Sequence, residues 1–208
     1  MGTAEVFKSK GWENIKKELD YVPTFCVANK EGQPIQYEIN DVPLAVFYTD
    51  VQEAKIELEE ARSGLSEMDG LDLIPFPMGT AFQLWGEDKA ALVPSAASIA
   101  AAGAPPGTNP MSQQVPLFAC MEIMREGEDG TPRLPLFLDP DDAKKAMNMA
   151  LESDGSPDSD PFEIVGLSLQ KAVEMLATVP ESPAFQFVTP ESSQKYIKNY
   201  LDGGGEFV

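Results

Sequence analysis

Histidine is absent from this chain of 208 residues, and only two cysteines are present. The missing histidine removes the commonest general base and the Ser-His and Cys-His pairs that activate nucleophiles. Two cysteines alone cannot complete a structural zinc site, and no apolar run approaches the ~20 residues that a membrane-spanning helix needs. We therefore predict a protein that is not an enzyme, with no catalytic, cofactor-binding or metal-binding residues.

Basic residues are also scarce: 15 lysines and arginines stand against 34 acidic residues, which gives a formal net charge of −19. Such a surface repels the phosphate backbone, so we expect no nucleic-acid partner. An anionic lipid surface repels it equally, unless the contact is local and hydrophobic. Two interpretations of the acidity stay open, namely solubility and an acidic surface that receives basic segments of another protein.

What the sequence does contain is a pattern that occurs twice. In each half an apolar strand, a polar turn and a second apolar strand precede an aspartate that opens a helix. The first apolar runs begin at Val22 and Val115, 93 residues apart, and the aspartates are Asp50 and Asp139, 89 residues apart. Self-similarity at a nearly constant offset indicates a duplicated folding unit.

Each half is predicted to contain a β-hairpin, a helix, a strand, a helix, a strand and a final helix, in that order. We therefore predict an α+β fold of two pseudo-symmetric repeats, with mixed or antiparallel sheets covered by helices. The expected segments are an N-terminal amphipathic helix (1–21), a first repeat (22–102), a linker (103–114), a second repeat (115–201) and a tail (202–208).

Three local signals add detail to this fold. The run 71–78 contains two prolines and is predicted to be an edge strand, which 162–169 repeats 91 residues later. Thr189, which precedes a proline and an acid, is the predicted N-cap of the last helix. Cys26 and Cys120 occupy matching strands, and we predict buried small hydrophobes rather than a disulfide or a redox pair.

Two groups of apolar side chains are candidate partner-binding residues. A predicted amphipathic helix over 4–20 carries Trp12, Ile15 and Leu19 at i, i+3 and i+7, either to pack on the protein body or to hold a partner or a membrane surface. In the second half, methionines either fill the core or line an adaptable groove. These methionines are Met121, Met124, Met147 and Met149.

Three blocks of the sequence resemble a known family. They are the run 22–35 (VPTFCVANKEGQPI), the Asp-x-x-x-Ala helix starts at 50–54 and 139–143, and the run 184–195 (AFQFVTPESSQK). In this order, with Val-Pro-Leu-Phe at 115–118, the blocks are similar to the family of the twenty-two-kilodalton subunit of the translocon at the inner envelope membrane of chloroplasts, the Tic22-like family. The resemblance spans nearly all of residues 12–201.

The resemblance implies a soluble plastid, or cyanobacterial periplasmic, protein of two pseudo-symmetric halves that associates peripherally with membranes. It also implies a chaperone-like role in preprotein passage or outer-membrane biogenesis, with hydrophobic binding surfaces and no catalytic residues. The sequence departs from the family in its acidity, in the Ala- and Pro-rich stretch 90–110 and in the acidic loop 152–161. These departures leave the client open.

Two functions follow as hypotheses. The first is a non-enzymatic factor of plastid protein import that holds extended, basic segments of preproteins in apolar grooves rimmed by acids. The alternative is an extrinsic accessory subunit docked on a large plastid membrane complex, such as a photosystem of the thylakoid, through the N-terminal helix, the linker and the loops. Binding to unfolded clients that falls as salt is raised would favour the first, and stoichiometric co-purification with a membrane complex the second.

Overall fold

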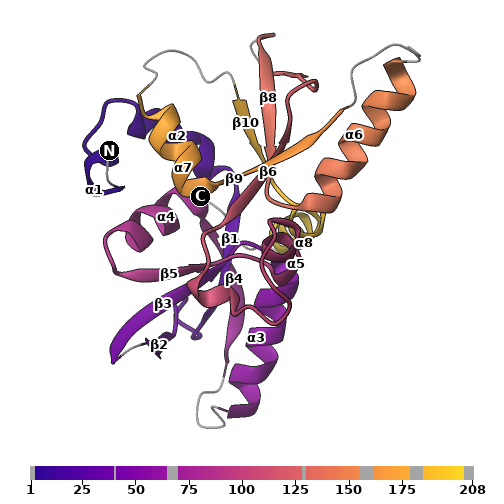
Figure 1. Cartoon of the computed structure of the whole chain (residues 1–208). Helices are drawn as coiled ribbons and strands as arrows, with labels where there is room; N and C mark the ends of the chain where they lie inside the picture. The colour runs from indigo at the N-terminus through magenta and orange to yellow at the C-terminus, as the bar shows by residue number, and fades with distance from the viewer. Residues whose placement is uncertain are drawn as a thin grey trace.

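The computed structural model describes residues 3–39, 41–64, 70–127, 130–154, 162–178 and 185–203. The chain folds into two units with the same order of elements, one below the other in Figure 1. The first unit contains β1 (Pro23–Ala28), β2 (Gln36–Ile39), β3 (Val42–Tyr48), α3 (Val51–Gly64), β4 (Asp72–Pro77), α4 (Met78–Gly86), β5 (Ala90–Val93) and α5 (Ala96–Ala101).

The second unit repeats this series after a short 3-10 helix, η1 (Pro110–Ser112), which lies in the predicted linker. Its elements are β6 (Pro116–Cys120), β7 (Arg125–Glu126), β8 (Pro132–Phe137), α6 (Pro140–Asp154), β9 (Ile164–Ser168), α7 (Leu169–Leu176), β10 (Phe185–Val188) and α8 (Glu191–Asp202). Two further helices, α1 (Thr3–Val6) and α2 (Trp12–Asp20), precede the first unit.

The two sheets have equivalent topologies. The first has the strand order β2-β3-β1-β4, with β5 parallel to β3, and the second has the order β10-β8-β6-β9, with β10 parallel to β8 and β7 paired to β8. The remaining pairings are antiparallel. This α+β arrangement of two similar sheet units, partly mixed and covered by helices, confirms the predicted fold class.

A central hydrophobic cluster joins the two units. It takes buried side chains from one face of each sheet and from α2, α4 and α7, among them Leu19, Phe47, Phe82, Leu117 and Leu169. Burial of apolar surface is the dominant favourable term in folding. The shared cluster therefore makes the two units one structural body, and β1 and β6 are buried along their whole length because both faces of each strand are covered.

The predicted continuous helix over 4–20 is wrong, because the structure divides this segment into α1 and α2. Between the two helices, Ser9 accepts a hydrogen bond from the backbone N–H of Trp12 through its Oγ at 3.2 Å. A Cβ atom on Gly11 would lie 2.5 Å from the carbonyl oxygen of Ala177, so the chain passes the end of α7 too closely for any other residue. The turn is thus fixed by packing between the N-terminal segment and the second unit.

The aspartates that were expected to open helices do so. Oδ1 of Asp50 accepts hydrogen bonds from two N–H groups of the first turn of α3, at 2.7 and 3.3 Å, and Asp139 does the same for α6 at 2.8 and 2.9 Å. The predicted N-cap Thr189 is wrong. Helix α8 begins at Glu191, and its N–H donates to Oδ2 of Asp142 at 2.8 Å, so a carboxylate of α6 replaces the threonine hydroxyl.

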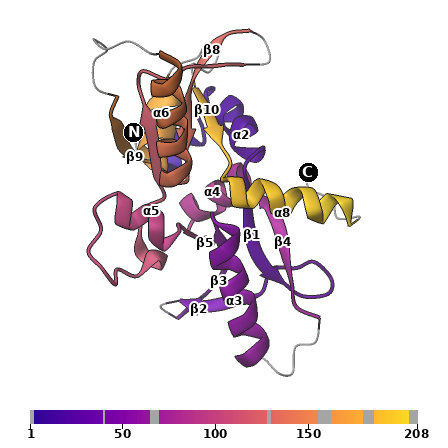
Figure 2. The same cartoon turned by 90° about the vertical axis from the view of Figure 1, so that its right-hand side faces the viewer.

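The last helix of each unit packs against the long helix of the other unit. α8 contacts α3, and α5 contacts α6, on opposite sides of the molecule in Figure 2. In the first of these contacts, Ser192 donates from its Oγ to Oδ2 of Asp50 at 3.3 Å. This reciprocal exchange adds to the shared core, so each unit completes the cover of the other.

Two sequence predictions fall partly outside the described residues. They are the acidic loop 152–161, of which 155–161 are not described, and the tail 202–208, of which 204–208 are not described. Within the described part of the chain, none of the helices combines the length and the apolar character required to cross a membrane.

Candidate binding surface

The three candidate residues of the N-terminal helix lie inside the protein. Trp12, Ile15 and Leu19 are exposed by 1%, 4% and 0% and belong to the central cluster. The indole of Trp12 packs on the rings of Phe7 and Phe82, with ring centroids 4.9 and 5.9 Å apart. The sequence left two alternatives for these residues, packing on the protein body or holding a partner or a membrane surface. In the structure they pack on the protein body.

Polar contacts fix the same helix on α4. Nζ of Lys16 donates to Oδ2 of Asp20 at 2.6 Å and to Oγ1 of Thr80 at 2.9 Å, and the N–H of Thr80 donates to Oδ1 of Asp20 at 3.0 Å. A Cβ atom on Gly79 would come within 2.6 Å of the carbonyl oxygen of Lys16. Lys16 and Asp20 therefore join α2 to the first unit.

Three of the four candidate methionines face solvent. Met121 and Met124 are 61% and 51% exposed on the turn after β6, and Met149 is 60% exposed on α6, whereas Met147 is half-buried. α6 packs against β6, β8 and β9, so both groups belong to the same unit. We call Met121, Met124 and Met149 the methionine surface. Its flexible, polarisable side chains can adapt to partners of varied shape.

In the turn that carries Met121 and Met124, one carboxylate bonds to the end of β6. The buried thiol of Cys120 donates to Oε2 of Glu122 at 3.0 Å, and this bond is the main cause that lowers the pKa of Glu122. Burial, and then the same carboxylate, raises the pKa of Cys120. Burial alone raises the pKa of Cys26 to about 12. Both cysteines are free and buried, as predicted, and their raised pKa values keep them as unreactive thiols.

A cleft of about 530 Å³ was not predicted from the sequence. It lies between α2, β7, β8 and β10, and Tyr21, which is 80% exposed, stands at its edge. Its charged walls include Glu18 and Arg133, whose carboxylate oxygen and guanidinium nitrogen are 3.8 Å apart. The lining residues run from position 18 to position 194, so local sequence patterns carry no signal for this cleft.

These features define a class of protein: a duplicated α+β unit with one shared core, whose exposed apolar side chains lie largely on the second unit. No protein-family model and no curated protein matches the chain. Among solved structures, it is similar to Tic22 from Plasmodium falciparum, with a TM-score of 0.73, 20% identity, and coverage of 92% of this chain and 99% of that one. It is also similar to Tic22 from Anabaena, which is described as a protein of protein transport, with a TM-score of 0.68, 19% identity, and coverage of 90% and 96%.

The chain therefore has the Tic22 fold over both units. This confirms, at the level of the fold, the resemblance that the sequence blocks carry. At about one identical residue in five, the likeness concerns the architecture, and the role of this chain has to be argued from its own surface.

Proposed function

We propose that the protein is a non-enzymatic, chaperone-like binding protein of plastid protein transport, which holds polypeptide segments and associates peripherally with membranes. The observation that carries this proposal is the likeness of at least 90% of the chain to two Tic22 structures, one of which is described as a protein of protein transport. The duplicated sequence blocks support the same role, because they occur in the order that the Tic22-like family shows.

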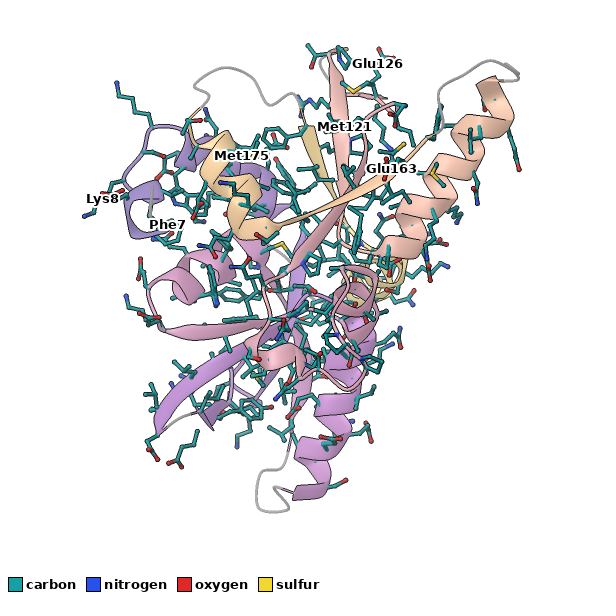
Figure 3. The ribbon with its side chains drawn as sticks, in the orientation of Figure 1. Phe7, Lys8, Met121, Glu126, Glu163 and Met175 are labelled. Carbon is teal, nitrogen blue, oxygen red and sulfur yellow. The ribbon has the colours of Figure 1, made fainter. Side chains whose placement is uncertain are left out.

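The surface of the second unit supports binding to other proteins. The methionine surface offers adaptable apolar contacts. The acidic Glu163 lies across from Met121 in the register of β6 and β9 (Figure 3), and Glu122 follows Met121 in the chain. A net charge of −19 steers basic segments toward the protein and weakens their encounter as salt screens it. Basic segments with scattered apolar side chains, like those of transit peptides, fit both properties.

The test uses an unfolded client, reduced and carboxymethylated α-lactalbumin, and a basic amphipathic peptide as a second probe. Binding of each fluorescent probe is measured by anisotropy at low and high salt. We expect the Met121→Ser, Met124→Ser, Met149→Ser triple variant to bind about tenfold more weakly, because removing three apolar contacts of roughly 0.5 kcal/mol each costs about 1.5 kcal/mol. Basic-peptide binding of the wild type should also fall at high salt.

A matched control is Met175→Ser on α7, where a methionine is 55% exposed but lies outside the methionine surface. It should bind both probes like the wild type. Failure of the wild-type protein to bind either probe would contradict the proposed function. The alternative role as an accessory subunit loses one of its expected contacts, since the apolar side of α2 is buried, and stoichiometric co-purification with a membrane complex would still favour it.

A further inference from the structure

The two sheets differ at their outer edge strands, β4 and β9. In the first sheet, the N–H of Met78 donates to the carbonyl of Val22 at 3.0 Å, next to the registered pair Pro23–Pro77. Backbone groups of an antiparallel strand alternate between its two edges. Residues 72, 74 and 76 therefore face β1, whereas residues 73, 75 and 77 direct their backbone groups away from the sheet.

The outer edge of β4 has no free N–H group at any of these positions. Pro75 and Pro77 have no N–H to offer. The N–H of Leu73 donates to Oδ1 of Asp72 at 2.8 Å, and the carbonyl of Leu73 accepts a hydrogen bond from the hydroxyl of Tyr196 in α8 at 2.8 Å. An extended chain would find no free donor on this edge between residues 73 and 77.

The corresponding edge of β9 is open. The N–H of Leu169 donates to the carbonyl of Val115 at 2.7 Å, so the register matches that of the first sheet and Ile164, Gly166 and Ser168 direct their backbone groups outward. At the offset of 91 residues, Gly166 and Ser168 take the places of Pro75 and Pro77. Among the described residues, no strand pairs with this edge and no group accepts a hydrogen bond from its outward N–H groups.

The space beside this edge is also open. Gly166 is exposed, and a Cβ atom added to it would meet no atom within 4 Å. Val165 is 40% exposed. A groove of about 560 Å³ runs along the end of the strand, lined by Gly166, Leu167 and Ser168 on one side and by Ile99 and Ala102 on the other. β9 runs between α7 and α6 in Figure 1.

The lengths of the two final helices explain the difference. The first N–H of each helix donates to a carboxylate of its own unit's long helix: Ala96 to Glu53 at 3.1 Å, and Glu191 to Asp142 at 2.8 Å. With the two starts aligned in this way, Ala101 takes the place of Tyr196. α5 has 6 residues and α8 has 12, so only α8 reaches an edge strand with a side chain that can close it.

We propose that the open edge of β9 binds an extended, basic segment of a partner protein by strand addition, with the backbone of Ile164, Gly166 and Ser168 supplying the hydrogen bonds. This inference rests on the proposed function and locates its binding site. An unpaired edge is a template for any extended polypeptide, because main-chain hydrogen bonds give affinity without a fixed sequence.

Charge selects a basic segment over a second copy of this chain. Two copies would each bring a net charge of −19 to the shared edge. The registered pair Cys120–Ile164 places the next residues, Met121 and Glu163, beside each other at one end of the strand (Figure 3). Glu122, whose carboxylate bonds to Cys120, adds a second carboxylate at this end. The basic side chains of the segment are therefore expected at this end.

The test introduces into β9 a proline at the position equivalent to Pro75 of β4. Gly166→Pro removes one outward N–H and leaves pairing with β6 intact, because this N–H points away from β6. Gly166→Ala is the matched control, since it keeps the N–H and its Cβ meets open space. The probe is a ten-residue peptide of alternating Lys and Val, together with the same peptide N-methylated at alternate amides.

We expect Gly166→Pro to bind the peptide about tenfold more weakly, because one hydrogen bond is lost and the proline ring blocks its neighbour. Gly166→Ala should bind like the wild type, and the N-methylated peptide should bind the wild type about tenfold more weakly. Circular dichroism and urea unfolding check that Gly166→Pro is folded. If this variant does not fold, the test is the amide exchange of Ile164 and Gly166 in the wild-type protein, which should slow when the peptide binds.

The outcomes separate this inference from the proposed function. If both variants bind the peptide equally and the amides of β9 stay unprotected, strand addition is overturned while client binding stands. If the wild type fails to bind unfolded α-lactalbumin as well, the proposed function itself fails. If light scattering shows a wild-type dimer that Gly166→Pro abolishes, the occupant is a second copy, and the assignment to a basic segment is overturned.

Discussion

The first sheet is covered on its outer face by α3 and α8, whereas the second is covered there by α6 and approached only by the short α5. Phe25, Val46 and Leu58 belong to a large cluster under α3, to which Tyr196 and Ile197 of α8 add. The equivalent cluster in the second sheet consists of Phe118, Phe137 and Ala143, with three further half-buried neighbours. The helices thus cover the outer face of the first sheet more completely than that of the second.

The exposed apolar residues follow the same division. Within the described residues, exposed large hydrophobic side chains are concentrated in the second unit: Met121, Met124, Met149, Leu151, Val165, Met175 and Leu201, against Val42 and Ile56 in the first. These side chains are spread over the turn after β6 and over α6, β9, α7 and α8. We infer that the first unit contributes more to stability and that the second unit contributes more of the binding surface.

The largest expected effect tests this division at equivalent core positions. Phe25→Ala should lower the free energy of unfolding by about 4 kcal/mol, because the ring is fully buried and packs edge-on against Tyr196 at 5.4 Å. Phe118→Ala, 93 residues later, should cost about 3 kcal/mol, since fewer neighbours surround it. Urea unfolding measures both, and a larger loss for Phe118→Ala would contradict the assignment of stability to the first unit.

Much of the fold could be predicted because its signals are local. The two strand-turn-strand patterns, the capping aspartates Asp50 and Asp139, and the prolines of the edge strand each act within a few residues of their position. The duplication strengthened each signal by repeating it. Burial of Cys26 and Cys120 followed from the same strands.

The rest depends on contacts between distant segments. An amphipathic pattern shows that Trp12 has an apolar face, but it does not show what covers that face, which is α4 and α7. The capping of α8 uses Asp142, 49 residues away from Glu191, and so displaces Thr189. The sequence shows that Gly166 stands where the first unit has Pro75. The direction of the Gly166 N–H, however, depends on the register of β9 with β6, which the sequence does not show.

A smaller effect is expected where α8 closes β4. Tyr196→Phe should lower the free energy of unfolding by about 1 kcal/mol, because the carbonyl of Leu73 loses its hydroxyl donor. Burial raises the pKa of Tyr196 to about 12, so the hydroxyl remains a donor at neutral pH. Tyr200→Phe is the control. Its ring stacks on Tyr196 at 6.2 Å, and a change within about 0.5 kcal/mol is expected there.

The same variant sharpens the comparison of the two edges. Pro75 and Pro77 remain in place when the hydroxyl is removed, so Tyr196→Phe should gain no affinity for the Lys-Val peptide. A clear gain would show that the tyrosine alone, rather than the prolines, keeps extended chains away from β4.

The smallest effect concerns how the two final helices are held at their starts. Glu191 opens α8 and pairs with Lys145 of α6 and with Lys195, both at 2.8 Å, and these two lysines lower the pKa of Glu191 from 4.5 to about 2. A carboxyl whose pKa is depressed by folding adds stability that is fully present above its unfolded pKa. This contribution should be lost as the pH falls from about 4.5 toward about 2.

Lys145→Met should raise the pKa of Glu191 part of the way toward 4.5, as followed by NMR titration of the side-chain carboxyl. Lys144→Met is the matched control, because Lys144 pairs with Asp141 at 3.0 Å and leaves Glu191 unchanged. Both pairs are exposed, so added salt should also bring the pKa of Glu191 toward its ordinary value. α5 begins at Ala96, which has no charged side chain to pair with a lysine, so the two helix starts differ in this contact. An ordinary pKa for Glu191 in the wild type would contradict that difference.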